Sequence, residues 1–456
     1  MTTQVIARTG EQYVERLAQN LAANERQGTT LLVSGLTLAQ DKFISAALSA
    51  YGFNVKILDV PDNAALRVGK EFGNRGQCNP TYFTVGNLVK FLCALRDEQG
   101  LSTEKIIQEF AFVTAGACGP CRFGSYVTEY RKALRDSGFD GFRVLTVSQT
   151  AGADQSVGGE DGVRAGIAMY RHAITALILG DILNARMYAI RPYERVRGET
   201  DKVVAQCQDD LEATLAGRRS LVAAAHRCRK RLDAIAVDRD LVKPRVSIIG
   251  EFWAMTTEGD GNYHLQRYLE SQGAEVDIQL ITGWFLYLIW QGRNDTRKRQ
   301  ALDGRDGAGR GLLGANPWRR RALLWVAERA LLGSFDFYAR CMGLKRYRFV
   351  DMQRLATLAE RFYDTDLRGG EGHMEVGKVI HNAQKPDMHM TISVKPFGCM
   401  PSSAVSDGVQ SKIVELYPDM VYLPIETTGD GAVNVYSRIQ MQLHKARKLA
   451  GSQRSH

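Results

Sequence analysis

Short apolar runs alternate with helix-length amphipathic segments in both halves of this chain. The first half is predicted to form strands at residues 29–35, 54–60, 109–115 and 142–147. The second half repeats the order, with strands expected at residues 246–250, 275–281, 388–394 and 420–426. Strands that alternate with helices indicate a parallel sheet covered on both faces.

The chain is also too long for one hydrophobic core. It has 456 residues, whereas single cores stop growing near about 250–300 residues. We expect an α/β fold of two Rossmann-like or flavodoxin-like lobes with parallel sheets. The predicted domains are an N-terminal lobe (1–160), a helical connector (161–240) and a C-terminal lobe (241–456), because residues 161–240 have a continuous helical period.

Composition and the first residues favour a soluble, cytoplasmic protein. Hydrophobic residues make up 45% of the chain and charged residues 24%, close to the averages for globular proteins. The first 17 residues, MTTQVIARTGEQYVERL, lack the apolar core of a secretory signal. The most apolar stretches, from Ala173 and Ile281, are shorter than the roughly 20 residues that cross a bilayer.

Basic residues exceed acidic ones, 59 to 50, and part of the excess lies between Arg293 and Arg321. A solvated surface is the simplest interpretation of such a patch. An acidic protein partner or the phosphates of a coenzyme are alternatives. Nucleic acid is the weakest candidate, because no nucleic-acid module accompanies the patch.

The most informative chemistry lies in the cysteines. Cys78 occurs in GQCNP, Cys118 and Cys121 in GACGPC, and Cys399 in FGCMP. Each lies in a turn containing glycine and proline, beside a predicted strand end or helix start. Ligands of parallel α/β sheets bind outside the carboxyl ends of the strands, so these four thiols are expected to converge between the lobes.

Four cysteines hold either zinc or an iron–sulfur cluster. Structural zinc sites usually combine two close pairs of ligands, whereas this chain has one Cys-x-x-Cys pair and two solitary cysteines. The spacing therefore favours a cluster, although zinc and a thiol redox pair stay open. The remaining cysteines lie in helical patterns that favour buried packing, with the last kept as a reserve ligand: Cys93, Cys207, Cys228 and Cys341.

The motifs around these cysteines carry a family resemblance. The runs are GQCNPTYFTVGNLVKFL, GACGPCRFGSYVTEYRKAL, RPYE, IGEFWAMTTEGDGNYHLQRYLESQGAEV, EGHMEVGKVI and VKPFGCMPSS. Their combination and order resemble the cluster-binding component of the superfamily of 2-hydroxyacyl-CoA dehydratases, benzoyl-CoA reductases and double-cubane cluster proteins. The similarity extends over roughly residues 74–403.

The resemblance implies an enzyme component that holds an oxygen-sensitive [4Fe-4S] or double-cubane [8Fe-9S] cluster on Cys78, Cys118, Cys121 and Cys399. Its electrons would come from a separate ATP-hydrolysing activase with its own cluster, since this chain has no G-x-x-x-x-G-K-[ST] loop. It would then reduce or dehydrate a small or CoA-linked substrate. A homodimer, or a heterodimer with a related subunit, would match the resemblance.

Three polar residues in the same loops are candidates for proton delivery, which reductions at a cluster require. Glu251 directly follows a predicted strand, and Glu371 and His373 lie in GGEGHMEVG. Helix capping and an ordinary helix N-terminus are the alternative interpretations. Tyr193 and Glu194 of RPYE are expected to fix the connector against a lobe instead of touching substrate.

Two other classes of function stay open at this stage. One is an electron carrier or scaffold that holds a cluster without binding substrate, which would need no open coordination position beside a cavity. The other is an interaction protein stabilised by zinc, which metal content would distinguish.

Overall fold

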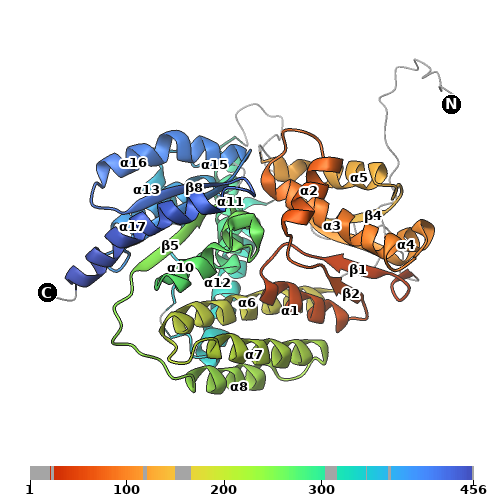
Figure 1. The fold of residues 1–456 in the computed structure, drawn as a ribbon, viewed down its shortest axis with the longest axis horizontal. Coiled ribbons are helices and arrows are strands. Elements are labelled where there is room, and N and C mark those ends of the chain that lie inside the picture. The colour runs from red at the N-terminus through yellow and green to blue at the C-terminus, as the bar shows by residue number, and fades with distance from the viewer. Residues whose placement is uncertain are drawn as a thin grey trace, which may run out of the picture.

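The computed structural model describes residues 25–116, 121–148, 166–302, 316–345, 347–367 and 371–453, together with Leu21. Two four-stranded sheets organise these residues, and every strand pair in them is parallel. Figure 1 shows the sheets in two lobes, flanked by helices. The predicted α/β fold with two lobes is confirmed.

The strands lie close to the runs predicted for them. The N-terminal sheet contains β1 (Thr30–Val33), β2 (Asn54–Ile57), β3 (Phe110–Gly116) and β4 (Arg143–Ser148). The C-terminal sheet contains β5 (Arg245–Gly250), β6 (Glu275–Ile278), β7 (Met390–Pro396) and β8 (Tyr422–Thr427). The prediction for residues 275–281 was too long, because a helix already begins at Ile281.

Both sheets have the same strand order. The N-terminal order is β2-β1-β3-β4 and the C-terminal order is β6-β5-β7-β8, so the second strand of each lobe lies at an edge and the third pairs with the first. The direction of winding reverses between β1 and β3 and between β5 and β7. In open α/β sheets such switch points, at the carboxyl ends of the strands, are where ligands bind.

Helices cover both lobes. The N-terminal lobe has α1 (Leu38–Ser49), α2 (Asn63–Phe72), α3 (Asn79–Asp97), α4 (Thr103–Glu109) and α5 (Tyr126–Asp136). The connector has α6 (Ile167–Ile190), α7 (Glu199–Ala216) and α8 (Leu221–Asp233). The C-terminal lobe has α9 (Phe252–Thr256), α10 (Leu265–Ser271), α11 (Ile281–Leu302), α12 (Pro317–Cys341), α13 (Met352–Ala359), α14 (Gly372–Ala383), α15 (Met400–Ala404), α16 (Ser411–Leu416) and α17 (Ala432–Gln453).

The connector is part of a continuous core and not a separate layer. One hydrophobic cluster joins α1 of the first lobe to α6, α7, α8 and the C-terminal sheet. Residues Ile167–Tyr193 are long and apolar enough to cross a membrane, yet 61% of their apolar window is buried inside the described structure. That burial is what the core helix of a soluble protein requires.

Asp181, in the middle of α6, links three parts of the fold. Its Oδ1 accepts hydrogen bonds from Nε2 of Gln40 at 2.7 Å and from the backbone N–H of Ile281 at 3.0 Å. Its Oδ2 accepts from the N–H of Thr282 at 2.6 Å. The carboxylate therefore caps the N-terminus of α11 from another helix, where unpaired amides and the helix dipole favour a negative charge.

We expect Asp181→Ala to lower the free energy of unfolding by about 2–4 kcal/mol, because it leaves buried helix amides without acceptors. Asp209→Ala is the control. The side chain of Asp209 is 72% exposed and pairs with Lys42, so its removal should cost about 0.5 kcal/mol. Denaturant unfolding of both variants measures the difference. Equal losses would contradict the capping role of Asp181.

Candidate functional site

Three of the four predicted ligand cysteines come from loops that meet between the lobes. Cys78 precedes α3, Cys121 follows β3, and Cys399 follows β7. Cys78 and Cys399 are buried, Cys121 is half-buried, and all three are free thiols. Cys118 lies outside the described residues.

The loops of Cys78 and Cys399 are tied together by backbone contacts. The N–H of Asn79 donates to the carbonyl of Phe397 at 3.0 Å, and its side-chain amide donates to the carbonyl of Thr427 at 2.7 Å. Gly398 has φ +77°, and a Cβ there would lie 3.2 Å from Cα of Cys78. Glycine at this position therefore allows the close approach of the two loops.

Cys121 is held against the same loop. Its Sγ accepts a hydrogen bond from the N–H of Phe123 at 3.5 Å, as the N-cap of a 3₁₀ turn (Arg122–Ser125). The next residue, Arg122, donates from Nε to the carbonyl of Gly398 at 3.2 Å. Arg122 thus connects the loop of Cys121 to the loop of Cys399.

The thiols share a poorly solvated environment. Sγ of Cys78 lies 3.1 Å from the hydroxyl of Tyr126 and 3.2 Å from that of Thr81. Burial, together with the charges of Glu251, Glu371 and Cys78, raises the pKa of Cys121 to about 12. Burial also raises the pKa of Cys399. Cys121 and Cys399 are therefore protonated at neutral pH.

Glu251 reaches this region because β5 ends in a conformation that only glycine tolerates. Gly250 has φ +126°, and a Cβ there would lie 2.0 Å from the carbonyl oxygen of Val394 in β7. Glu251 follows at the carboxyl end of β5, as predicted, and caps α9 by accepting from the N–H of Ala254 at 2.8 Å. Burial raises its pKa to about 7.

Glu371 provides a second carboxyl group on the same side of the site. It lies at the N-terminus of α14 and is 5% exposed. Burial, followed by the charges of Glu251 and Glu375, raises its pKa well above the usual range. Both Glu251 and Glu371 act electrostatically on Cys121 and Cys399. Such influence weakens with distance, so the two carboxyl groups and the two thiols border one region.

His373 faces a different environment from the carboxyl groups. Its ring is fully buried, 5.3 Å from the ring of Tyr287 and 4.6 Å from that of Trp290 in α11. Burial lowers its pKa to about 4, and neither ring nitrogen has a hydrogen-bond partner among the described residues. His373 is therefore neutral at pH 7 and packed within an aromatic layer.

A third carboxyl group, Glu375, was not anticipated from the sequence. Its Oε1 accepts from the hydroxyl of Ser393 at 2.7 Å and from Nε2 of Gln410 at 2.9 Å. The hydroxyl of Tyr422 donates to Oε1 of Gln410. Burial raises the pKa of Glu375 to about 7. Its spacing of four residues from Glu371 placed both on one helix face and could have revealed it.

The other cysteines lie away from this site. Cys341, the predicted reserve ligand, is buried in the core shared by the connector and the C-terminal lobe. Cys207 and Cys228 are fully buried in the same core, and Cys93 is half-buried in α3. These positions agree with the packing role expected of cysteines inside helices.

Two other features singled out in the sequence, the RPYE motif and the basic patch, form contacts within the fold. The hydroxyl of Tyr193 donates to Glu275 of β6 at 2.8 Å, so it joins the connector to the C-terminal sheet as expected. In the patch, Arg293 pairs with Glu328 and Lys298 with Asp366. The N-terminal part of α12 nevertheless exposes large apolar side chains near its arginines: Trp318, Leu323, Trp325 and Val326.

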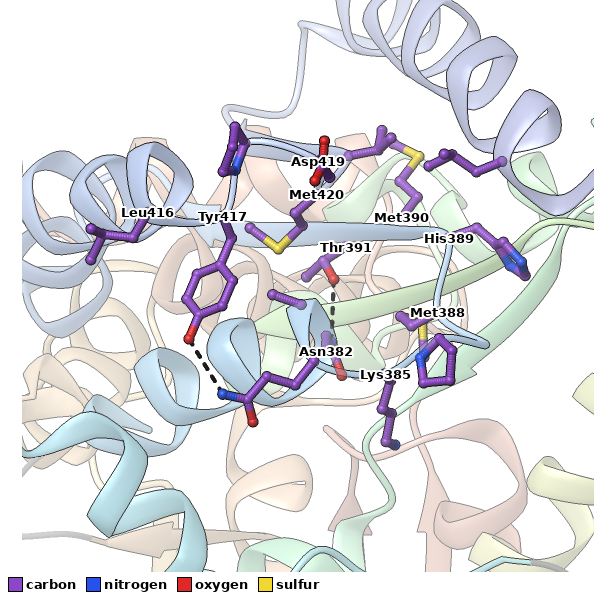
Figure 2. A pocket seen from close by; sticks show the side chains of 16 residues that line it. Asn382, Lys385, Met388, His389, Met390, Thr391, Leu416, Tyr417, Asp419 and Met420 are labelled. Carbon is purple, nitrogen blue, oxygen red and sulfur yellow. Dashed lines mark hydrogen bonds between the residues drawn. The ribbon is translucent and has the colours of Figure 1, made fainter. Parts of the chain in front are cut away.

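A cavity lies away from this site, at the amino end of the C-terminal sheet. It has a volume of about 420 Å³, and Figure 2 shows Asn382, Lys385 and Tyr417 around it. Met390, at its wall, begins β7, whereas Cys399 follows the end of that strand. Because a strand rises about 3.3 Å per residue, this cavity is roughly 20 Å from the thiols.

No protein-family model matches this chain, and no curated protein matches it either. Within the described ranges, which omit Cys118, no group of three or more His, Cys, Asp or Glu side chains has the arrangement of a metal-ion site. The ligand set and the family resemblance therefore stay predictions, and the convergence of three cysteine loops is the structural observation on which they depend.

Proposed function

We propose that this chain is the cluster-binding component of an ATP-dependent low-potential reductase or 2-hydroxyacyl-CoA dehydratase system. The observation that carries the proposal is the convergence of Cys78, Cys121 and Cys399 from three separate loops, beside the carboxyl groups of Glu251 and Glu371. The resemblance of the surrounding motifs adds Cys118 as a fourth ligand.

The donor set fits an iron–sulfur cluster. Thiolates prefer soft metals, and these three cysteines are free. Burial raises the pKa of Cys121 and Cys399, so these two thiols need a positive partner to ionise, which iron ions would provide. The hydroxyls of Tyr126 and Thr81 lie within hydrogen-bond distance of the Cys78 sulfur, where such contacts tune a redox potential. When bound, a cluster would accept and pass on single electrons of low potential.

The carboxyl groups favour an enzyme over a pure electron carrier. Burial raises the pKa of Glu251 to about 7 and that of Glu371 further above its usual range. A carboxyl group that stays protonated near neutral pH is able to donate a proton to a reduced or dehydrated substrate. An electron carrier has no need of a proton donor at this position. We therefore assign proton delivery to Glu251 and Glu371, and packing of the aromatic layer to His373.

Electrons would come from a separate activase in the cytoplasm. The exposed apolar face of α12, with Trp318 and Trp325 more than half exposed, carries Arg319, Arg320 and Arg321. Apolar surface bordered by arginines suits a protein partner with an acidic contact surface. We propose this face as the docking surface for the activase. A homodimer, or a heterodimer with a related subunit, completes the proposed assembly.

Metal analysis of protein purified without oxygen tests the proposal. We expect iron and acid-labile sulfide in the purified chain, and an electron paramagnetic resonance signal after strong reduction. About four irons per chain would indicate one [4Fe-4S] cluster, and about eight would indicate a double cubane that needs further ligands. Zinc without iron would exclude the proposed function and favour the zinc-stabilised interaction protein.

A further inference from the structure

A second cavity, of about 280 Å³, lies between the C-terminal sheet and helices α11 and α14. It is distinct from the thiol site, although α14 borders both. Four cationic side chains line it: Arg245, Arg348, Lys378 and Lys385. Among the described residues, two acidic side chains also line it, Asp277 and Asp387.

Arg245 engages both of those acids. It donates from Nη1 to Asp387 at 2.6 Å and from Nη2 to Asp277 at 3.1 Å. In the part of the chain that the structure describes, no carboxylate forms an ion pair with Arg348, Lys378 or Lys385. The cavity therefore has an excess of positive charge that the described residues do not neutralise.

Lys378 is the most informative of these cations. It is half-buried in the middle of α14, and its ammonium donates to Oε1 of Gln279. Burial lowers its pKa to about 8, although the charges of Asp277 and Glu371 partly oppose this shift. Lys385 follows the C-terminus of α14, where the helix dipole alone favours a cation. Lys378 is therefore the cation that indicates an anion site here.

Neutral groups in the wall add hydrogen-bonding capacity. Nδ1 of His381 and Nε2 of Gln279 are buried and have no partner in the described structure. Burial, helped by the charges of Lys385, Arg354 and Lys378, lowers the pKa of His381 to about 4. Its neutral ring carries one N–H donor. Lys378 and His381, three residues apart on the helix, face the same side.

We propose that this cavity binds a phosphomonoester, with the phosphate against Lys378 and the organic part against Phe349, Val350 and Met352. Lysine is a point-charge donor well suited to phosphate, and the three apolar side chains line the same cavity. The volume is close to the lower limit for small-molecule sites, so the organic part is small.

This site is separate from the proposed electron-transfer chemistry. Seven residues separate Glu371 from Lys378 along α14, which corresponds to about 10 Å of helix. Phosphate binding is therefore expected whether or not the protein contains iron. Failure of one proposal leaves the other intact.

Calorimetric titration of the full chain with phenyl phosphate, inorganic phosphate and benzoate tests the inference. We expect phenyl phosphate to bind most tightly, inorganic phosphate more weakly and benzoate most weakly. Lys378→Met should weaken phenyl phosphate binding by roughly 10–100-fold. Lys202→Met, which removes the same charge from an exposed position of α7, should leave the affinity unchanged.

Thermal unfolding of each variant separates lost binding from lost folding. Arg348 is exposed at the cavity, so Arg348→Met should not disturb the core, and we expect it to weaken binding by about threefold. Benzoate binding as tightly as phenyl phosphate would overturn the assignment to phosphate. Unchanged affinity in a folded Lys378→Met variant, or no heat with either phosphate, would overturn the site.

Discussion

Replacing Cys121 with serine should reduce the iron content of anaerobically purified protein to about a tenth or less of the wild-type value. Serine is well suited to the structural position, because the side chain at residue 121 caps a 3₁₀ turn by accepting from the N–H of Phe123. A serine hydroxyl accepts the same bond and is a preferred N-cap. The variant should therefore fold normally and lose only the soft sulfur donor.

The matched control is Cys93→Ser. Cys93 is also half-buried, but it lies inside α3, where its sulfur accepts from Nη2 of Arg96 at 3.8 Å. Iron content should stay at the wild-type level in this variant. Thermal unfolding and circular dichroism would show whether either protein is misfolded. A folded Cys121→Ser protein with full iron content would exclude Cys121 as a ligand.

Much of the architecture could be predicted because parallel α/β lobes have a strong sequence pattern. Strands buried on both faces form short continuous apolar runs. The central strand β5 of the C-terminal sheet follows that pattern. The end of β6 was predicted less well. Polar and apolar residues alternate from Glu275 to Leu280, a pattern typical of a strand. However, α11 begins at Ile281, whose N–H Asp181 accepts, and no local signal indicates a cap that comes from another helix.

The meeting of Cys78, Cys121 and Cys399 could be predicted from topology only in part. Cys121 and Cys399 follow the carboxyl ends of β3 and β7, where ligands of parallel sheets bind, whereas Cys78 lies between α2 and α3. The position of Glu251 followed from the same argument. What the sequence could not show is that Gly398 and the backbone of Cys78 nearly touch, since that contact depends on how the two lobes pack.

The surroundings of the buried polar residues were harder to predict. Asp181 lies in one of the most apolar helices of the chain, and Glu375 in a short helix with mixed character. Each is held by partners from distant elements, Ile281 and Gln410 among them. Periodicity assigns such residues to a helix face but does not reveal which side chains they meet, because tertiary packing decides that.

Replacing Glu371 with glutamine should lower turnover by about 100-fold while leaving the iron content unchanged. Glutamine has nearly the same shape but cannot donate the proton of a carboxylic acid. The assay is the reaction of a 2-hydroxyacyl-CoA thioester in the presence of the activase, ATP and reductant. Glu360→Gln, at the exposed end of α13, is the control and should have wild-type turnover.

The pH dependence of turnover distinguishes proton donation from a structural effect. Burial raises the pKa of Glu251 from 4.5 to about 7, so its carboxyl group is protonated below that pH and ionised above it. If Glu251 donates a proton, wild-type turnover should fall as the pH rises through about 7. Glu251→Gln should have low turnover and should lose this decline, because the titrating group is gone. A Glu251→Gln variant that keeps the wild-type pH profile would show that another group controls the reaction.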